Sequence, residues 1–120
     1  MQYVAGKCNI GKNNRLKRLV LGTAFIISAF GIYYLVQSNG LDRTFLLMLF
    51  PVFSLGFLSV LEAKGSFCVA NGLNGTYNID AGEQEINSVS DRAKDKMKAF
   101  EIVIISVAAA AVATGIIYFI

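Results

Sequence analysis

The chain has 120 residues, of which 55% are hydrophobic and 16% charged, and its mean hydropathy is +0.56. About a quarter of the residues of an ordinary soluble domain are charged, so this composition predicts a membrane protein. The net charge is +3 and the isoelectric point about 9.0, but the cations cluster beside apolar runs instead of covering a basic face, which argues against nucleic acid as a partner.

Histidine is absent, and there are two cysteines, Cys8 and Cys68. Without histidine the chain cannot form the Ser-His or Cys-His pairs of the common hydrolases, and two cysteines alone do not complete a structural zinc site. We therefore expect no catalytic residue, no metal ligand and no cofactor, and we predict that the protein is not an enzyme.

Residues 1–18 form a basic N-terminal arm directly before an apolar run. Cations beside a membrane helix attract anionic lipid headgroups. We therefore expect four cations of the arm to lie at the membrane interface: Lys12, Arg15, Lys17 and Arg18.

Two uncharged runs follow, over residues 19–36 and 45–61. A helix needs about 20 apolar residues to cross the hydrocarbon core, and backbone groups in lipid must bond within their own segment, so both runs predict transmembrane helices. Asn39-Gly40 between them is a strong helix breaker. The pattern predicts an antiparallel two-helix transmembrane hairpin over residues 19–63.

Three residues of this hairpin are expected to shape its packing. Gly22 and Gly56 have no side chain to hold a neighbouring helix away, so both are predicted at helix contacts. Pro51 lacks a backbone donor and is expected to kink the second helix.

A secretory signal peptide is the alternative for the first forty residues, because a basic start and an apolar run precede Val36-Gln37-Ser38, which resembles a cleavage site. The run is longer than a usual signal core and ends with the bulky Tyr33 and Tyr34. These features favour a retained membrane helix.

Residues 64–100 read as a cytoplasmic loop that ends in an amphipathic helix. The apolar side chains Val89, Ala93, Met97 and Phe100 recur at helical spacing after a serine that can cap a helix. These side chains lie opposite the cations of the same segment, which are Arg92, Lys94, Lys96 and Lys98. We expect the helix to run unbroken into the third span.

The third span, residues 101–120, carries two series of small residues spaced by four. One series is Ser106, Ala110 and Thr114, and the other is Ala111 and Gly115. Small residues at this spacing let helix backbones pack closely in lipid. We predict that they contact another helix.

Ten of the eleven Lys and Arg residues lie in the arm and the long loop, and only Arg43 lies on the opposite side. Cytoplasmic segments carry the excess of Lys and Arg. The sequence therefore predicts an all-α protein of the inner (plasma) membrane with three transmembrane helices, an antiparallel hairpin plus a C-terminal helix extended into the cytoplasm. The N-terminus is expected in the cytoplasm and the C-terminus outside.

The start of the chain has an Asn-x-Gly pattern, two nearby arginines and a glycine just inside the first span; these residues are Asn9, Gly11, Arg15, Arg18 and Gly22. Over residues 1–70 this pattern resembles the YgaP-like transmembrane domain family, small inner-membrane proteins mostly without an assigned function. That family commonly has Asp where this chain has Asn14, and often Cys-Pro where it has Cys68-Val69. In the best-known relative the hairpin anchors a sulfurtransferase domain and pairs with a second copy. We expect no such domain here, so the resemblance does not imply that activity.

The leading hypothesis is a scaffold, accessory subunit or self-associating anchor without catalysis of its own. Its expected partners are the lipid bilayer with anionic headgroups and other transmembrane helices, in a homo-oligomer or a larger membrane complex. A membrane thiol-redox protein is the first alternative, because the hairpin returns Cys8 and Cys68 to one interface and Lys7 is expected to lower the pKa of Cys8. A holin-like pore, suggested by size and span number, is the second.

Overall fold

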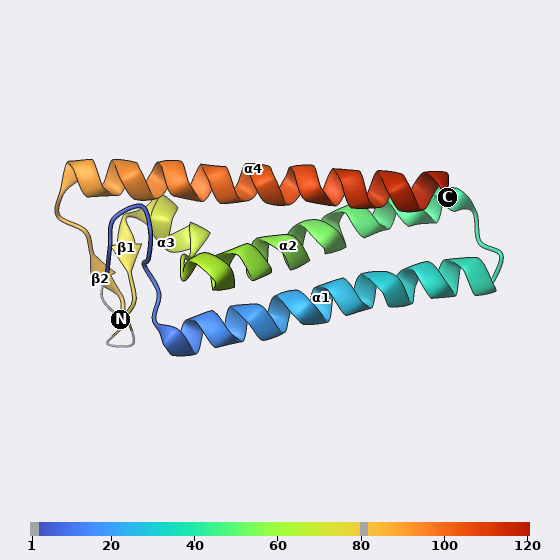
Figure 1. The fold of residues 1–120 in the computed structure, drawn as a ribbon, viewed down its shortest axis with the longest axis horizontal. Helices are drawn as coiled ribbons and strands as arrows, with labels where there is room; N and C mark the ends of the chain where they lie inside the picture. The colour runs from blue at the N-terminus through green and yellow to red at the C-terminus, as the bar shows by residue number, and fades with distance from the viewer. Residues whose placement is uncertain (1–2, 80–81) are drawn as a thin grey trace.

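The computed structural model describes residues 3–79 and 82–120. Three long helical segments run side by side along a molecule of 54 × 24 × 16 Å (Figure 1). They are α1 (Lys12–Ser38), η1 (Arg43–Met48) continued by α2 (Leu49–Gly65), and α4 (Val89–Phe119). All three are long and apolar enough to cross a membrane. The prediction of an all-α membrane protein with three spans is confirmed.

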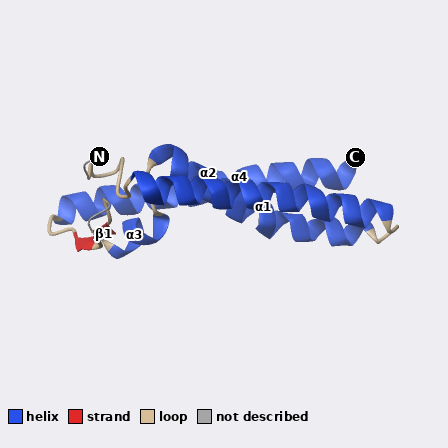
Figure 2. Cartoon of the chain, turned by 90° about the horizontal axis from the view of Figure 1, so that it is seen from below, coloured by secondary structure: helices blue, strands red, loops and turns tan. Residues whose placement is uncertain are grey.

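The remaining segments lie at one end of the three helices, around the first turns of α4. We call this end the head; it comprises residues 3–11, 66–79 and 82–98. It contains α3 (Val69–Asn74) and a small antiparallel pairing of β1 (Thr76–Tyr77) with β2 (Gln84–Glu85). Figure 2 shows the strand and most of the loops at this end. The turn between α1 and η1 lies at the opposite end, together with the C-terminus (Figure 1).

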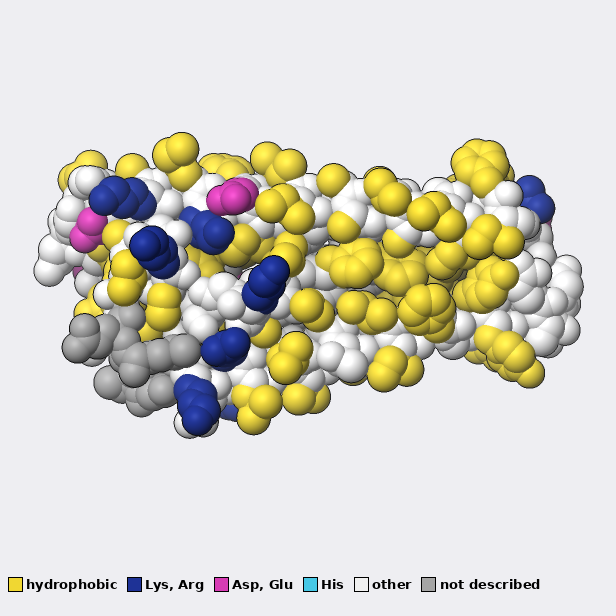
Figure 3. Space-filling view, viewed as in Figure 1, with side chains coloured by type: hydrophobic (Ala, Val, Ile, Leu, Met, Phe, Trp, Pro, Cys, Tyr) yellow, Lys and Arg dark blue, Asp and Glu magenta, His cyan; other side chains and the backbone are white. Residues whose placement is uncertain are grey.

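The three long helices meet along an apolar core, whose buried side chains are Ala29, Val36, Leu46, Leu49, Phe53 and Ala110. Many other apolar side chains of the bundle point outward; Val20, Ile27 and Val112, for example, are 63%, 65% and 62% exposed. Figure 3 shows this apolar surface over the long part of the molecule, with most Lys and Arg side chains near the head. An apolar exterior of this kind suits a lipid surrounding.

Helix α1 begins within the segment that the sequence assigned to the arm. Its N-cap is Gly11, in an extended conformation with φ −84° and ψ 178°. The four predicted interface cations therefore occupy the first two turns of a helix that continues into the span.

Pro51 is the third residue of α2. Proline has no backbone N–H to donate, and Pro51 lies where the 3-10 geometry of η1 passes into the α-helix. The irregularity of the second span lies before Pro51, in the 3-10 helix η1.

Helix α4 begins at the predicted cap and is unbroken over 31 residues. The Ser88 hydroxyl accepts a hydrogen bond from the Asp91 N–H at 3.3 Å. The apolar side of this helix does not pack inward: Val89 and Met97 are 83% and 74% exposed, whereas Asp95 is fully buried. The arm and α3 meet α4 on the Asp95 side, where a backbone N–H and a tyrosine hydroxyl need an acceptor.

Candidate functional site

The polar side chains buried where the head meets the bundle include an amide and two carboxylates. Asn9 and Asp95 are 0% exposed, and Glu62 is 4% exposed. Burying a polar group without a hydrogen bond costs about 2–7 kcal/mol, and burying an unpaired charge costs more. The partners of these three residues therefore show what holds the head together.

Asn9 joins the arm to the segment after α2. Its side-chain amide donates to the Cys68 carbonyl at 3.1 Å, and its side-chain oxygen accepts from the Cys68 N–H at 2.6 Å. The backbone N–H groups of Asn9 and Ile10 both donate to the Ser66 carbonyl, at 3.0 and 3.2 Å. The arm is thus fixed beside the end of α2 and the start of α3.

Glu62 lies at the boundary between bundle and head. Its carboxylate accepts from the Val69 N–H at 2.9 Å and lies 3.7 Å from the Arg18 guanidinium. The other terminal nitrogen of Arg18 donates to the Cys68 sulfur at 3.3 Å. The ion pair joins α1 to α2, and the hydrogen bonds of the same two side chains join both helices to the start of α3.

Asp95 holds the start of the arm against α4. It accepts from the Tyr3 hydroxyl at 2.8 Å and from the Gly6 N–H at 2.6 Å. The Tyr3 ring also stacks on Tyr77, with ring centres 4.5 Å apart. Burial of the phenol raises the pKa of Tyr3 above its ordinary value, and the bond to the Asp95 carboxylate raises it further. We call residues 3–10, held in this way, the strap.

A polar pocket of about 270 Å³ lies beside Cys68. Its walls include Asn14, Arg18, Cys68, Asn71, Asn78 and Glu83. Amide and guanidinium groups thus supply hydrogen-bond donors around a thiol that is only 4% exposed. The pocket has room for a small polar molecule next to the sulfur.

The two cysteines lie in the same part of the molecule, because Asn9, which follows Cys8, bonds directly to the Cys68 backbone. Burial raises the pKa of the Cys8 thiol above its ordinary value. The net direction is thus opposite to the lowering expected from Lys7. A raised pKa leaves less of the reactive thiolate at neutral pH.

The four predicted interface cations divide into two kinds. Lys12, Arg15 and Lys17 are exposed on the first turns of α1, where they can meet lipid headgroups. Arg18 is half-buried and is engaged with Glu62 and Cys68 inside the molecule.

Gly22 and Gly56 face each other at a close contact of α1 with α2. A Cβ atom on Gly22 would lie 2.7 Å from a methyl group of Val60 and 2.9 Å from the Gly56 carbonyl oxygen. A Cβ atom on Gly56 would lie 2.9 Å from the Ile26 side chain. The missing side chains are thus what lets the two backbones come together.

The two series of small residues on α4 have different surroundings. Ser106, Ala110 and Thr114 are 1%, 0% and 5% exposed, and they face the hairpin. Ala111 is exposed, and a Cβ atom on Gly115 would meet nothing within 4 Å. The first series is thus buried against the hairpin, whereas the second series has open space where a larger side chain would lie.

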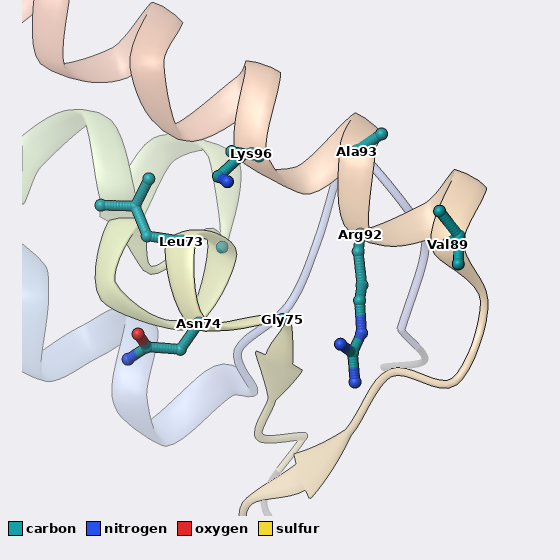
Figure 4. A pocket seen from close by; sticks show the side chains of 8 residues that line it. Leu73, Asn74, Gly75, Val89, Arg92, Ala93 and Lys96 are labelled. Atoms are coloured by element: carbon teal, nitrogen blue, oxygen red, sulfur yellow. The ribbon is translucent and has the colours of Figure 1, made fainter.

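A second hollow, of about 330 Å³, lies between α3 and the first turns of α4 (Figure 4). Leu73 and Val89 supply apolar walls, and Arg92 and Lys96 supply cations. Arg92 points from α4 towards the strands, and its Nε donates to the Ile86 carbonyl. Its charged group therefore serves the packing of the head.

Comparisons with known proteins give no relative: no family model matches the chain, and no curated protein or solved structure gives a significant match. Within residues 3–79 and 82–120, no group of three or more His, Cys, Asp and Glu side chains is placed to hold a metal ion. The contacts within the chain are therefore the basis for its proposed function.

Asp95 and Tyr3 were not predicted from the sequence. The inward position of Asp95 could have been inferred from helical spacing. Asp95 and Ala99 lie on the same side of α4 as Ser106 and Ala110. Tyr3 had no such signal, since its contact depends on how the arm folds over α4.

Proposed function

We propose that the chain is a small integral membrane protein that acts as a scaffold, accessory subunit or self-associating anchor, without catalysis of its own. The observation that carries this proposal is the uncovered face of α4 around Gly115, where an added Cβ would meet nothing within 4 Å. Ala111 lies one turn before it and is exposed, whereas Gly115 itself is half-buried. Small outward residues let another helix approach closely in lipid.

The polar groups buried in the head and at its boundary with the bundle support the same proposal. Asn9, Glu62 and Asp95 are all engaged in bonds that fix the head on the bundle. A fixed head on a compact anchor suits a protein that positions a partner at a membrane.

Gly115→Leu tests this proposal, with Gly31→Leu as its matched control. A Cβ atom on Gly31 also meets nothing within 4 Å, but its neighbours at four-residue spacing are the bulky Ile27 and Leu35. We expect Gly115→Leu to reduce energy transfer between labelled chains in vesicles, or co-purification of a partner, and Gly31→Leu to leave both unchanged. Equal behaviour of the two variants would remove the case for this face.

We also propose that the head faces the cytoplasm, with the protein in the inner membrane and the C-terminus outside. Support comes from the ten cations in or beside the head and the single Arg43 at the other end. In a background without native cysteines, Asn39→Cys should react with an impermeant label added outside cells, and Ser90→Cys should not. Both positions are exposed, so labelling of Ser90→Cys from outside would reverse the orientation.

We further propose that residues 1–70 are related to the YgaP-like transmembrane domain. The motif residues have contacts that support this: Asn9 binds Cys68, Arg18 pairs with Glu62, and Gly22 packs on Gly56. An experimental structure of a member of that family with the same three contacts would strengthen the relationship, and their absence would count against it.

A thiol-redox protein is the second candidate, favoured by one observation. The Arg18 guanidinium donates to the Cys68 sulfur at 3.3 Å, at a position that Asn9, the neighbour of Cys8, also contacts. Mild oxidant should then crosslink Cys8 and Cys68 within one chain, and Cys8→Ser and Cys68→Ser should lose the same phenotype. No crosslink and no shared phenotype would exclude this candidate.

A further inference from the structure

A groove of about 280 Å³ lies between the end of α2 and α4, on the head side of the bundle. Its walls include Leu61, Lys64 and Gly65 from α2 and Lys98, Glu101 and Ile105 from α4. We propose that this groove binds one phospholipid with an anionic headgroup. The inference rests on the membrane placement in the proposed function and names a specific lipid partner for it.

The charged part of the groove fits a phosphate. Lys64 and Lys98 come from different helices and line the same space. Lys98 lies 3.7 Å from Glu101, whereas Lys64 has no ion pair among the described residues. Two lysines and one glutamate leave one positive charge in the groove. Basic pockets between transmembrane helices on the cytoplasmic side are typical sites for anionic headgroups.

The apolar part of the groove fits an acyl chain. Leu61 and Ile105 lie on the membrane side of the charged residues, and Ile105 is 47% exposed. A lipid can place its phosphate between the lysines and its chain along these side chains. A free phosphate ion would leave the apolar wall uncovered, so the groove favours a lipid.

Two features of the groove weaken the binding of an anion, so both lysines are needed to bind a phosphate. Glu101 repels a phosphate, and the C-terminal end of α2 at Gly65 carries partial negative charge. The opposite end of the bundle has only Arg43, which lies over the Tyr118 ring at 5.7 Å. The proposed lipid therefore belongs to the leaflet on the head side.

Native mass spectrometry of the purified protein in detergent tests this site, with phosphatidylglycerol and phosphatidylcholine of identical acyl chains as probes. The wild type should retain one phosphatidylglycerol in preference to phosphatidylcholine. Lys64→Gln and Lys98→Gln should each weaken phosphatidylglycerol binding about fivefold. Glu101→Gln should strengthen it about as much, because it removes the repulsion and releases Lys98.

Lys17→Gln is the matched control, because it removes the same charge near the same membrane surface but from α1, outside the groove. It should leave phosphatidylglycerol binding within about twofold of the wild type. Equal retention of the two lipids, an equal loss in Lys17→Gln, or no gain in Glu101→Gln would overturn the proposal. Displacement of phosphatidylglycerol by inorganic phosphate would also overturn it, in favour of a free-anion site.

This measurement is independent of association between chains. If lipid selectivity is lost in the lysine variants while the Gly115→Leu test fails, the lipid site stands without the proposed anchor function. If Gly115→Leu reduces association but Lys64→Gln leaves phosphatidylglycerol binding unchanged, only the lipid site is refuted.

Discussion

Where α1 meets α2 in the bundle, Gly22 and Gly56 bring two backbones together, whereas in the head the strap meets α4 through the buried carboxylate of Asp95. Apolar helices gain little from leaving equally apolar lipid, so their association depends on close fit. In the head, hydrogen bonds to buried polar groups select which segments meet. One short chain thus uses steric fit in one region and polar pairing in the other.

The two regions join at Glu62. This residue ends the apolar part of α2, pairs with Arg18 of α1, and accepts from the N–H of Val69, the first residue of α3. A carboxylate deeper in the span would be costly to bury. At the boundary the same group couples the position of the head to the hairpin.

The largest effect is expected where steric fit is broken. Gly22→Ala places a Cβ atom against the backbone of α2, so the free energy of unfolding should fall by about 2–3 kcal/mol. Reversible unfolding in mixed micelles measures this. Gly31→Ala, in open space, should leave stability unchanged or raise it by up to about 1 kcal/mol, because alanine favours helix. Equal losses would show that close fit does not hold α1 to α2.

Breaking the polar pairing should have a smaller and more local effect. Asp95→Asn removes a charged acceptor from Tyr3 and Gly6 and should cost about 1.5 kcal/mol, equivalent to roughly tenfold faster hydrogen exchange at the strap. Exchange in the bundle should not change. Asp91→Asn, one turn earlier on α4, is the control for the loss of charge. Equal exchange in both variants would contradict the role of Asp95.

Alkaline pH sharpens the same contrast. The pKa of Tyr3 is raised in the folded head above its ordinary value of 10.0. Above pH 10, the Tyr3 hydroxyl therefore loses its proton when the strap is released but keeps it while the strap is bound. The contribution of Tyr3 is therefore complete below that pH and is lost as pH rises further. One unit above it, we expect a loss of less than about 1 kcal/mol, because the half-buried ring is partly screened by water. Stability curves of the head against pH should flatten in Tyr3→Phe; a slope identical to the wild type would exclude Tyr3 as its source.

The smallest effect concerns Cys8. Because burial raises its pKa, iodoacetamide should modify Cys8 more slowly at neutral pH in the folded protein than in the unfolded chain, as followed by mass spectrometry. Lys7→Gln should leave this rate unchanged. A clear slowing in Lys7→Gln would instead show that Lys7 activates the thiol.

The sequence by itself determined the three spans and the cap of α4. An uncharged run long enough for a bilayer, such as residues 19–36, is a property of one segment, as is a serine positioned to accept from an N–H three residues later. These features need no knowledge of neighbouring segments. The close approach at Gly22 and Gly56 was also anticipated, since a missing side chain limits what can pack there.

Only the tertiary structure decided which faces of α4 are used. Ser106 and Ala110 satisfy the same four-residue spacing as Ala111 and Gly115, and the position of the hairpin alone selects the first pair. The hydrogen bonds of Asp95 likewise depend on the arm, since its partner Tyr3 lies 92 positions away in the chain. The spacing of residues describes one helix by itself. Which face of that helix is buried depends on the segment that packs against it, and local spacing does not specify contacts between distant segments.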